Sequence, residues 1–338
     1  MKGYIDSKLQ DRFASSQIAV DVNDKTIIVY SWPVDLPSNE LEKFLESICS
    51  GYQVQFNGLH QEENTPYQNV QVEDAGRIEP FEEGGFLPEL NAFFPTMLAD
   101  TRILGYSAGY RSYDKIFKST LPVSIGDQFS LYQIKLNSTA RLYFGIEACV
   151  WAIFEAKTKS LSLINADYYI GLPLTYVNDK FSARLRLFHE SSHLGDEFLL
   201  ETQGIKRVNP SMEGLDISVG YEPIDKGLIF FGYRRILRSD ESFKVKPNSI
   251  YYGFNYFLNF AKIQTFNVVG TPYIAAYIAN NENNHWNFDS SVAVGYQWDK
   301  NYGRKLRIYV LGHHGYSTDG QFSRKRSKYV SLHLLYGY

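Results

Sequence analysis

Apolar and polar residues alternate with a period of two along most of the carboxyl-terminal part of the chain. The clearest run places seven apolar side chains of residues 142–154 on one face, with Glu147 and Glu155 on the other. Residues 250–260 repeat the arrangement. Such alternation is typical of a strand that has lipid on one face and a polar interior on the other. It predicts an all-β transmembrane barrel over residues 98–338.

The alternating segments number about twelve antiparallel strands, and an even number brings both ends of a bacterial barrel to the periplasm. The strands are predicted near residues 101–109, 129–138, 141–155, 162–176, 182–191, 211–223, 227–237, 249–260, 263–277, 288–298, 304–314 and 328–338. Their connections alternate in length, with short turns such as 178–180 and 224–226 and long loops such as 110–128 and 192–210. Short periplasmic turns and long external loops favour the outer membrane.

Ahead of the barrel the spacing of apolar residues changes. Residues 18–32 predict a β-hairpin, residues 38–51 a helix, and residues 52–56 a third strand, after a short helix through Leu9 and Phe13. This order resembles the BON module of small periplasmic domains. A generic α/β plug or interaction domain stays an alternative.

These patterns divide the chain into three parts. A small α/β periplasmic domain covers residues 1–58, a polar linker rich in Glu, Gly and Pro covers residues 59–97, and the barrel follows. No run of about 18 apolar residues occurs, which excludes a spanning helix. The start, Met1 to Tyr4, lacks the apolar stretch of a signal peptide. Because an outer-membrane protein must be exported, we expect that a leader was removed or lies upstream.

Composition narrows the function classes. Aromatic residues make up 16% of the chain, which suits rings placed at two membrane–water interfaces. The net charge is -3, and positive and negative residues are mixed along the chain, so no basic surface is expected. Nucleic acid is therefore not an expected partner. The chain contains no phosphate loop, dinucleotide fingerprint or zinc spacing, so no cofactor is assigned. Cys49 and Cys149 do not form a metal-ligand pair.

The last strand carries a further signal. Val330, Leu332, Leu334, Tyr336 and Tyr338 are spaced by two and end on an aromatic residue. This resembles the terminal strand that the barrel-assembly machinery recognises. The resemblance implies that machinery as a partner.

The candidate chemistry lies where the predicted fifth strand ends. His189 and Ser191 share a face with the leucines before them, so both should face lipid near the outer leaflet. The next strand places Asn209 and Glu213 on the same face. A serine nucleophile needs a histidine that takes its proton and a third group that fixes the imidazole tautomer. The pattern therefore predicts a lipid-facing set of serine, histidine and polar orienter.

An outward His-x-Ser at this height resembles the sites of two barrel hydrolases, the outer-membrane phospholipase A and the lipid A deacylase. The resemblance implies that Ser191 is the nucleophile, His189 the base, and Asn209 or Glu213 the orienter. The substrate would be a membrane phospholipid or lipopolysaccharide. In these hydrolases the motif continues with Asn after the serine, whereas this chain has Ser192 at that position. The candidate third residues also lie farther along the chain than in either enzyme.

Taken as a whole, the chain is similar to an uncharacterised family of bacterial envelope proteins known as a domain of unknown function. The segments that carry the similarity are Phe94-Pro95 through Ala99-Asp100-Thr101-Arg102, Leu163 to Tyr168, His189 to Phe198, and Val208 to Glu213. This similarity supports an outer-membrane location and implies no established activity.

Several alternatives stay open. Asp196 and Glu197 would be either solvated loop residues or a site for calcium or a lipopolysaccharide-associated cation, because hard cations prefer carboxylate oxygens. Charged residues on the lumen side would line a narrow pore or pair and close it. These residues are Glu147, Glu155, Asp167, Arg184, Arg186, Glu190, Asp289 and Arg307. The protein would otherwise be a structural or tethering barrel whose front domain binds an envelope partner. A homodimer is also left open.

Overall fold

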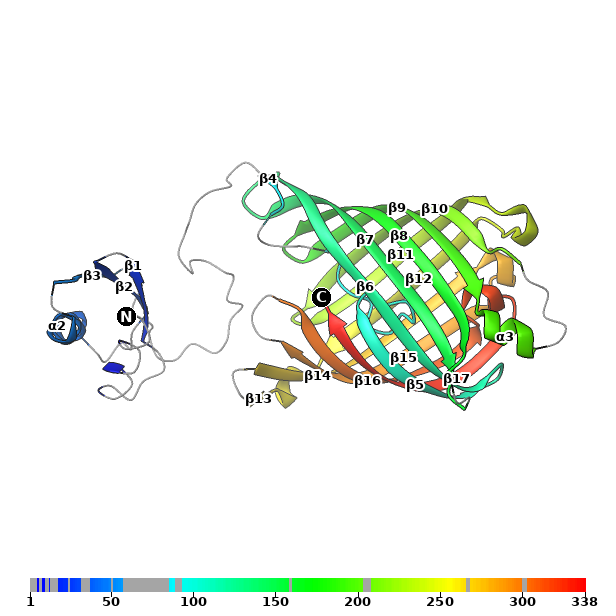
Figure 1. The fold of residues 1–338 in the computed structure, drawn as a ribbon. Coiled ribbons are helices and arrows are strands. Elements are labelled where there is room, and N and C mark those ends of the chain that lie inside the picture. Colours follow the sequence, from blue (N-terminus) through cyan, green and yellow to red (C-terminus); the bar gives the residue numbers. More distant parts are fainter. Residues whose placement is uncertain are drawn as a thin grey trace. The chain divides into compact units, whose positions relative to one another are not determined.

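The computed structural model describes most of the barrel and part of the region ahead of it. The described residues are 18–23, 25–31, 37–49, 51–56, 85–88, 93–157, 160–202, 208–265, 268–299 and 303–338, with Ile5, Lys8, Leu9 and Arg12. The chain divides into two compact units, residues 1–80 and 81–338 (Figure 1). Each unit is described by itself.

The first unit is a small α/β domain. Its elements are β1 (Ala19–Asn23), β2 (Thr26–Ser31), α2 (Ser38–Ile48) and β3 (Gln53–Phe56). β1 pairs with β2 antiparallel, and β2 pairs with β3 parallel. Leu41 and Leu45 of α2 pack with Ile27 and Leu9 in one apolar core. The hairpin, the helix and the third strand are thus confirmed, while Phe13 of the predicted first helix lies outside the described residues.

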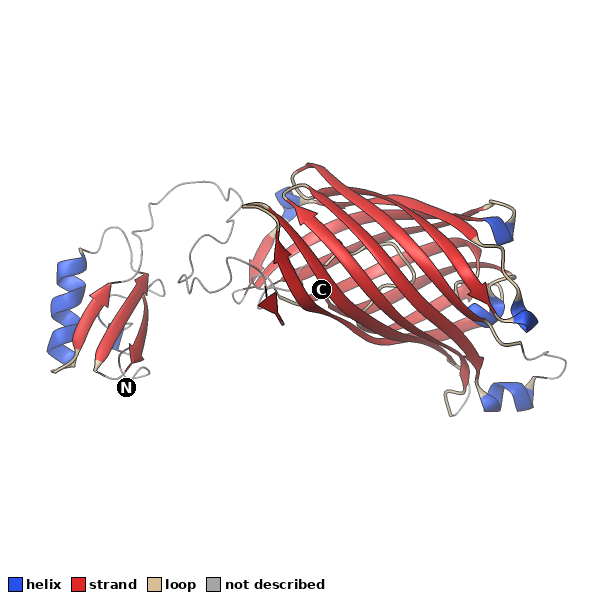
Figure 2. Ribbon diagram, turned by 90° about the horizontal axis from the view of Figure 1, so that it is seen from above, coloured by secondary structure: helices blue, strands red, loops and turns tan. Residues whose placement is uncertain are grey.

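The second unit is a closed antiparallel barrel. Its twelve strands are β5 (Tyr106–Asp114), β6 (Lys118–Lys135), β7 (Ala140–Glu155), β8 (Leu163–Asn178), β9 (Phe181–Leu194), β10 (Ser211–Ile224), β11 (Gly227–Ser239), β12 (Asn248–Phe257), β14 (Val268–Asn281), β15 (Phe288–Asp299), β16 (Lys305–Tyr316) and β17 (Arg326–Gly337). Each pairs with its neighbours, and β17 pairs with β5. Figure 2 shows the strands side by side around the barrel. Closure leaves the twelve-strand ring without an edge.

Short strands and helical segments accompany the twelve barrel strands. β4 (Gly85–Phe86) pairs with β6, and β13 (Ile263–Thr265) pairs with β14. The helical segments are α3 (Asp196–Glu201), η1 (Glu241–Phe243), η2 (Asn259–Ala261), η3 (Glu282–Asn284) and η4 (Gly320–Phe322). Among the helices that the structure describes, none is both long and apolar enough to cross a membrane.

The strands are joined alternately at two ends of the barrel. One end, here called the loop end, carries the connections 115–117, 156–162, 195–210, 240–247, 282–287 and 317–325. The other end carries mostly tight turns, such as 179–180 and 225–226. Because twelve is even, β5 starts and β17 finishes at this turn end. The predicted alternation of turns and loops is confirmed for most of the connections.

The first hairpin corrects one prediction. We predicted a long loop at residues 110–128, but only residues 115–117 join β5 to β6. Thr120 and Ser124 made this segment resemble a loop, yet their side chains are buried on one face of β6. Small polar residues on one face of a strand suit a polar interior as well as they suit a loop.

The outer surface of the barrel is apolar. Side chains that point outward alternate with buried ones along the strands, and they include Ile125, Phe144, Leu187, Val294 and Leu332. A continuous exposed apolar band on a closed barrel is stable only in contact with lipid. The barrel is therefore of the outer-membrane type.

The lumen is partly filled by the chain that precedes β5. Leu98 lies in an apolar cluster with inward residues of several strands, Tyr273, Ala275, Ala293, Leu311 and Leu335. The Leu98 amide donates to Asn255 Oδ1 over 3.1 Å, and Asn255 Nδ2 donates to the Thr96 carbonyl over 2.7 Å. We predicted the first strand at residues 101–109, whereas β5 begins at Tyr106 and the residues before it pack inside the barrel.

Several charged residues in the lumen form ion pairs with one another. Asp216 is fully buried and forms ion pairs with Arg184 at 3.2 Å, Arg186 at 3.3 Å and Arg234 at 3.5 Å. The Tyr251 hydroxyl donates to the same carboxylate over 2.9 Å. Buried charges are tolerated only when partners satisfy them. Asp216 is therefore the carboxylate that three luminal arginines share, and Arg186 also pairs with Glu147 at 2.7 Å.

We expect Asp216→Ala to destabilise the barrel by about 3–5 kcal/mol, because three guanidinium groups would lose their shared partner in a buried site. The measurement is the denaturant midpoint of tryptophan fluorescence for the protein in detergent micelles. Glu241→Ala removes one carboxylate from the exposed turn η1 and is the control. Equal midpoints for the two variants would contradict this role of Asp216.

Candidate functional site

A histidine and a glutamate meet on the outer surface of β9 and β10. His189 and Glu213 are register partners, and His189 Nδ1 lies 3.1 Å from Glu213 Oε1. Their side chains are 42% and 43% exposed, on the face from which Leu187 projects. A hydrogen bond donated by Nδ1–H to a carboxylate selects the tautomer whose Nε2 can accept a proton. The pair thus lies on the lipid-facing surface, with Glu213 in position to set the tautomer of His189.

Ser191 lies two residues beyond His189, so both side chains belong to the same face of β9. Its register partners are Tyr168 on β8 and Ser211 on β10. Within the described residues, the Ser191 hydroxyl makes no hydrogen bond with His189. Such bonds are often long before substrate binds. The strand pairing brings the serine and the histidine to one outward patch near the loop end.

Asn209 does not reach this patch. Its side-chain amide donates to Asp240 Oδ2 over 3.1 Å, and its backbone amide donates to Ser242 Oγ over 3.2 Å. Hydrogen bonds from Ser242 and Asn209 hold the pKa of the Asp240 carboxyl below its ordinary value. Of the two orienters that the sequence left open, Glu213 is the one that contacts His189.

The carboxylates predicted to bind calcium lie in the first turn of α3. Glu197 Oε2 accepts a hydrogen bond from Ser160 Oγ over 3.4 Å, and Asp196 precedes it. Calcium takes about six to eight oxygen ligands. In the part of the chain that is described, no group of three or more His, Cys, Asp or Glu residues could hold a metal ion. The calcium site stays a prediction from the sequence.

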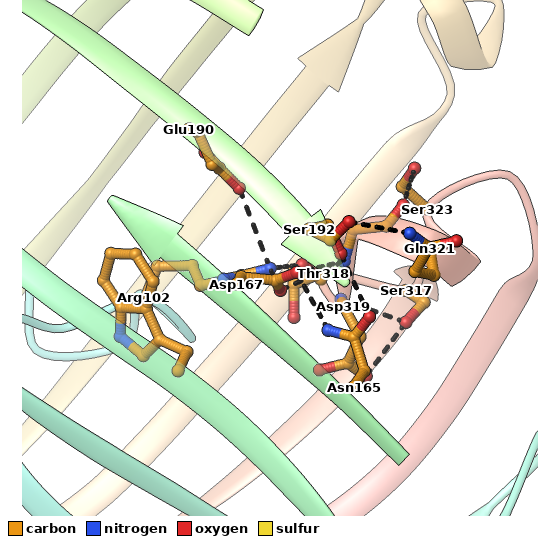
Figure 3. Close-up of polar contacts among 12 residues, drawn as sticks. Arg102, Asn165, Asp167, Glu190, Ser192, Ser317, Thr318, Asp319, Gln321 and Ser323 are labelled. Atoms are coloured by element: carbon orange, nitrogen blue, oxygen red, sulfur yellow. Dashed lines mark hydrogen bonds and ion pairs between the residues drawn. The ribbon is translucent and has the colours of Figure 1, made fainter. Parts of the chain in front are cut away.

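The lumen side of the same hairpin is braced by the connection between β16 and β17. Ser192 points inward, and its hydroxyl donates to Asn165 Oδ1 over 3.0 Å. Gln321 Nε2 donates to the Ser192 carbonyl over 2.8 Å (Figure 3). It also donates to the Val208 carbonyl over 3.1 Å. One amide group therefore joins both arms of the β9–β10 connection at the level of the candidate serine. No sequence signal pointed to Gln321, which lies 129 residues from Ser192.

Arg102 ties the luminal segment to the loop end. It pairs with Asp167 and donates to the Thr318 carbonyl, and it lies 3.9 Å from Glu190 (Figure 3). Asp167 also accepts a hydrogen bond from the Gly320 amide over 3.1 Å. Asp167 and Glu190 were predicted to face the lumen, and both contribute to this network.

Three aromatic rings cover the network at the loop end. Phe117, Phe198 and Phe322 come from three different connections, and their ring centroids lie 4.7 to 6.2 Å apart. They belong to a buried apolar cluster with Ile153 and Leu194. The connections 115–117, 195–210 and 317–325 therefore pack against each other at the loop end.

Comparison with protein families gives a match over most of the chain. The family described as "Protein of unknown function (DUF1207)" matches residues 48–338. The chain belongs to this family. Membership agrees with the similarity to an uncharacterised family noted from the sequence. A search of curated proteins finds no match.

Solved structures similar to this DUF1207 protein are membrane barrels. Outer membrane phospholipase A from Escherichia coli is 11% identical, with a TM-score of 0.48 over 71% of this chain and 95% of that one. The Salmonella typhi outer membrane phospholipase dimer with bound calcium is 12% identical, with a TM-score of 0.48 over 69% and 90%. The KdgM porin in complex with disordered oligogalacturonate is 15% identical, with a TM-score of 0.38 over 69% and 99%. At these identities the similarity is to the barrel fold and not to an activity.

The 317–325 loop is tethered by Asp319. Its Oδ2 accepts a hydrogen bond from Arg111 Nη1 over 2.8 Å. Burial alone would raise the pKa of Asp319, but the positive charges of Arg111 and Arg102 outweigh it and hold the pKa below the ordinary value of 3.8. A group whose pKa is lowered by folding contributes stability above its unfolded pKa and loses it as the pH falls.

We therefore expect Asp319→Asn to raise hydrogen exchange in residues 317–325 at neutral pH. The difference from the wild type should persist at pH 3.8 and vanish only below the lowered pKa of the folded protein, where the wild-type carboxyl is protonated too. Mass spectrometry of peptides from that loop gives the measurement, with Asp225→Asn at an exposed turn as the control. A pH-independent difference would count against the ion pair as the tether.

Proposed function

We propose that this DUF1207 protein is an outer-membrane serine hydrolase that cleaves ester-linked acyl chains from membrane lipids. The observation that carries the proposal is the 3.1 Å contact between His189 Nδ1 and Glu213, beside Ser191 on the lipid-facing surface. Polar residues that face lipid are costly, and most of this surface is apolar. A polar patch with the members of a catalytic triad is best explained by chemistry on lipid.

The three side chains take the usual roles of a serine hydrolase. Ser191 Oγ attacks the ester carbonyl carbon while His189 Nε2 takes the hydroxyl proton, and Glu213 stabilises the imidazolium through Nδ1–H. The bond to the alcohol oxygen then breaks, and His189 returns the proton to that oxygen. Water attacks the acyl-serine by the same route and releases the fatty acid.

The neighbours of Ser191 suit this chemistry. Tyr168 and Ser211 flank it on the adjoining strands and carry hydroxyl groups that can donate to the developing oxyanion. Leu185 and Leu187 project from the same strand face and would contact the acyl chain. A lipid would reach the patch by lateral movement in the membrane, without entering the lumen.

The proposed place is the outer leaflet of the outer membrane. The closed apolar barrel supports an outer-membrane location. If the small α/β domain is periplasmic, the loop end faces outward and the patch lies near the external surface. Association with lipopolysaccharide, the barrel-assembly machinery, calcium or a second copy stays a prediction.

We expect the refolded protein in detergent to release fatty acid from phospholipid or lipopolysaccharide. Ser191→Ala and His189→Ala should each lower the rate by about 10³-fold or more, and Glu213→Gln by roughly 10²- to 10⁴-fold. Release is measured by chromatography of free fatty acid, with calcium present and absent.

A second pair of residues provides the matched control. Ser290 and His314 are register partners near the loop end of β15 and β16, and the Ser290 hydroxyl donates to the His314 carbonyl over 3.3 Å. Ser290→Ala and His314→Ala change the same residue types on another part of the barrel and should leave release unchanged. Loss of release in all four alanine variants, or in none, would reject the proposed triad.

A narrow pore is the second candidate. A cavity of about 290 Å³ in the lumen is lined by charged side chains, Arg184, Arg186 and Arg234 among them. Since Phe117, Phe198 and Phe322 pack over the lumen, we expect no steady conductance from the wild type in planar bilayers. Phe322→Ala should produce brief openings, and Leu332→Ala on the outer surface should not. Stable conductance steps in the wild type would favour the pore.

A further inference from the structure

A β-bulge places an arginine beside the His189–Glu213 pair. In the pairing of β10 with β11, Glu213 is opposite Arg238 but Gly214 is opposite Ile236, so Leu237 is an extra residue. Simple alternation from the exposed Leu237 would turn Arg238 toward the lumen. Instead both side chains are exposed. Bulges occur at barrel rims and next to active sites, where they redirect a side chain.

The bulge creates a row of polar groups across three strands. His189 of β9 is opposite Glu213 of β10, which is opposite Arg238 of β11. Neighbouring strands lie about 4.8 Å apart, so Arg238 is about 10 Å from His189 along the surface. A headgroup at Arg238 would leave the adjoining ester of the same lipid within reach of the patch.

A second arginine lies one step from this row toward the middle of the barrel. Arg235 is opposite Leu215, is exposed, and donates through Nη1 to Asn248 Oδ1 over 3.3 Å. A cation on the lipid-facing surface is least costly near the interface, where phosphate groups lie. The two guanidinium groups thus stand on the same side of the candidate triad.

Neither arginine forms a close ion pair with a carboxylate in the described part of the chain. The structure records no ion pair within 4.0 Å for Arg235 or Arg238 there. Of the nearby carboxylates, Glu213 contacts His189 and Asp240 accepts hydrogen bonds from Ser242, while the positive charge of Arg238 acts on Asp240 without a close ion pair. A guanidinium group matches the oxygens of a phosphate with two parallel hydrogen bonds.

We infer that Arg238 and Arg235 bind the phosphate of an acylated membrane lipid and thereby select phosphate-bearing lipids for the Ser191 site. The choice of substrate rests on the proposed function, whereas the phosphate site itself does not require hydrolysis. The same phosphate chemistry occurs in glycerophospholipid and in lipid A.

Binding is tested on the full chain with Ser191→Ala, so that no lipid is consumed. Native mass spectrometry of the protein in detergent follows titration with phosphatidic acid, with lipid A, or with diacylglycerol, which lacks the phosphate. Adding Arg235→Gln and Arg238→Gln should weaken binding of the phosphate lipids by about tenfold or more, because each charge-assisted hydrogen bond contributes about that factor. Diacylglycerol binding should not change.

The control is Arg326→Gln with Lys328→Gln, which removes two exposed positive charges at the loop end of β17, five strands around the ring from β11. It should leave phosphate-lipid binding unchanged. Equal loss in this control, or no loss in the Arg235/Arg238 variant, would overturn the inference. Weaker binding of only one of the two phosphate lipids supports the inference and identifies which lipid supplies the phosphate.

Kinetics separate this inference from the proposed hydrolase. In a protein with Ser191 intact, Arg235→Gln and Arg238→Gln should raise KM for phosphate-bearing lipids about tenfold and leave kcat near the wild-type value. Arginine-dependent binding without any fatty-acid release would retain the phosphate site and reject the hydrolase. Fatty-acid release that stays unchanged in both arginine variants would retain the hydrolase and reject the phosphate site.

Discussion

The need to pair every backbone amide and carbonyl group shapes this barrel. Lipid offers no hydrogen-bond partners, so a sheet that crosses a membrane must close on itself. Here β17 pairs with β5, and the ring of twelve strands has no free edge. Closure also forces alternation, because each strand must present one set of side chains to lipid and the next set to the lumen.

Closure creates a lumen whose polar side chains must satisfy one another. Asp216 forms ion pairs with three arginines. Arg102 joins the luminal segment to Asp167 and to the 317–325 loop. Apolar contacts fill the rest, around Leu98 in the lumen and around Phe322 at the loop end. The interior is thus a packed core with a small charged cavity, and the loop that closes it also braces the hairpin that carries Ser191.

The same alternation leaves a few polar groups on the outer face, where each is exceptional. His189 and Glu213 satisfy one another there, and a bulge adds Arg238 to their row. In the proposed hydrolase, the polar groups inside and outside the barrel have separate tasks. The lumen network stabilises the barrel, while the outer patch is open to a lipid that arrives from the membrane.

The sequence by itself determined the barrel, most of its strands and the outward side of His189, Ser191 and Glu213, because a period of two depends only on which residues face lipid. It failed over residues 110–128, where small polar side chains on the inner face resemble a loop. Only the tertiary structure decided that Glu213 rather than Asn209 contacts His189, since that depends on strand register and on where Asp240 lies. The luminal packing of Leu98, the brace from Gln321 and the bulge at Leu237 join residues far apart in the chain or break the alternation. A local pattern carries no information about such contacts, because they depend on how the closed ring arranges its strands in space.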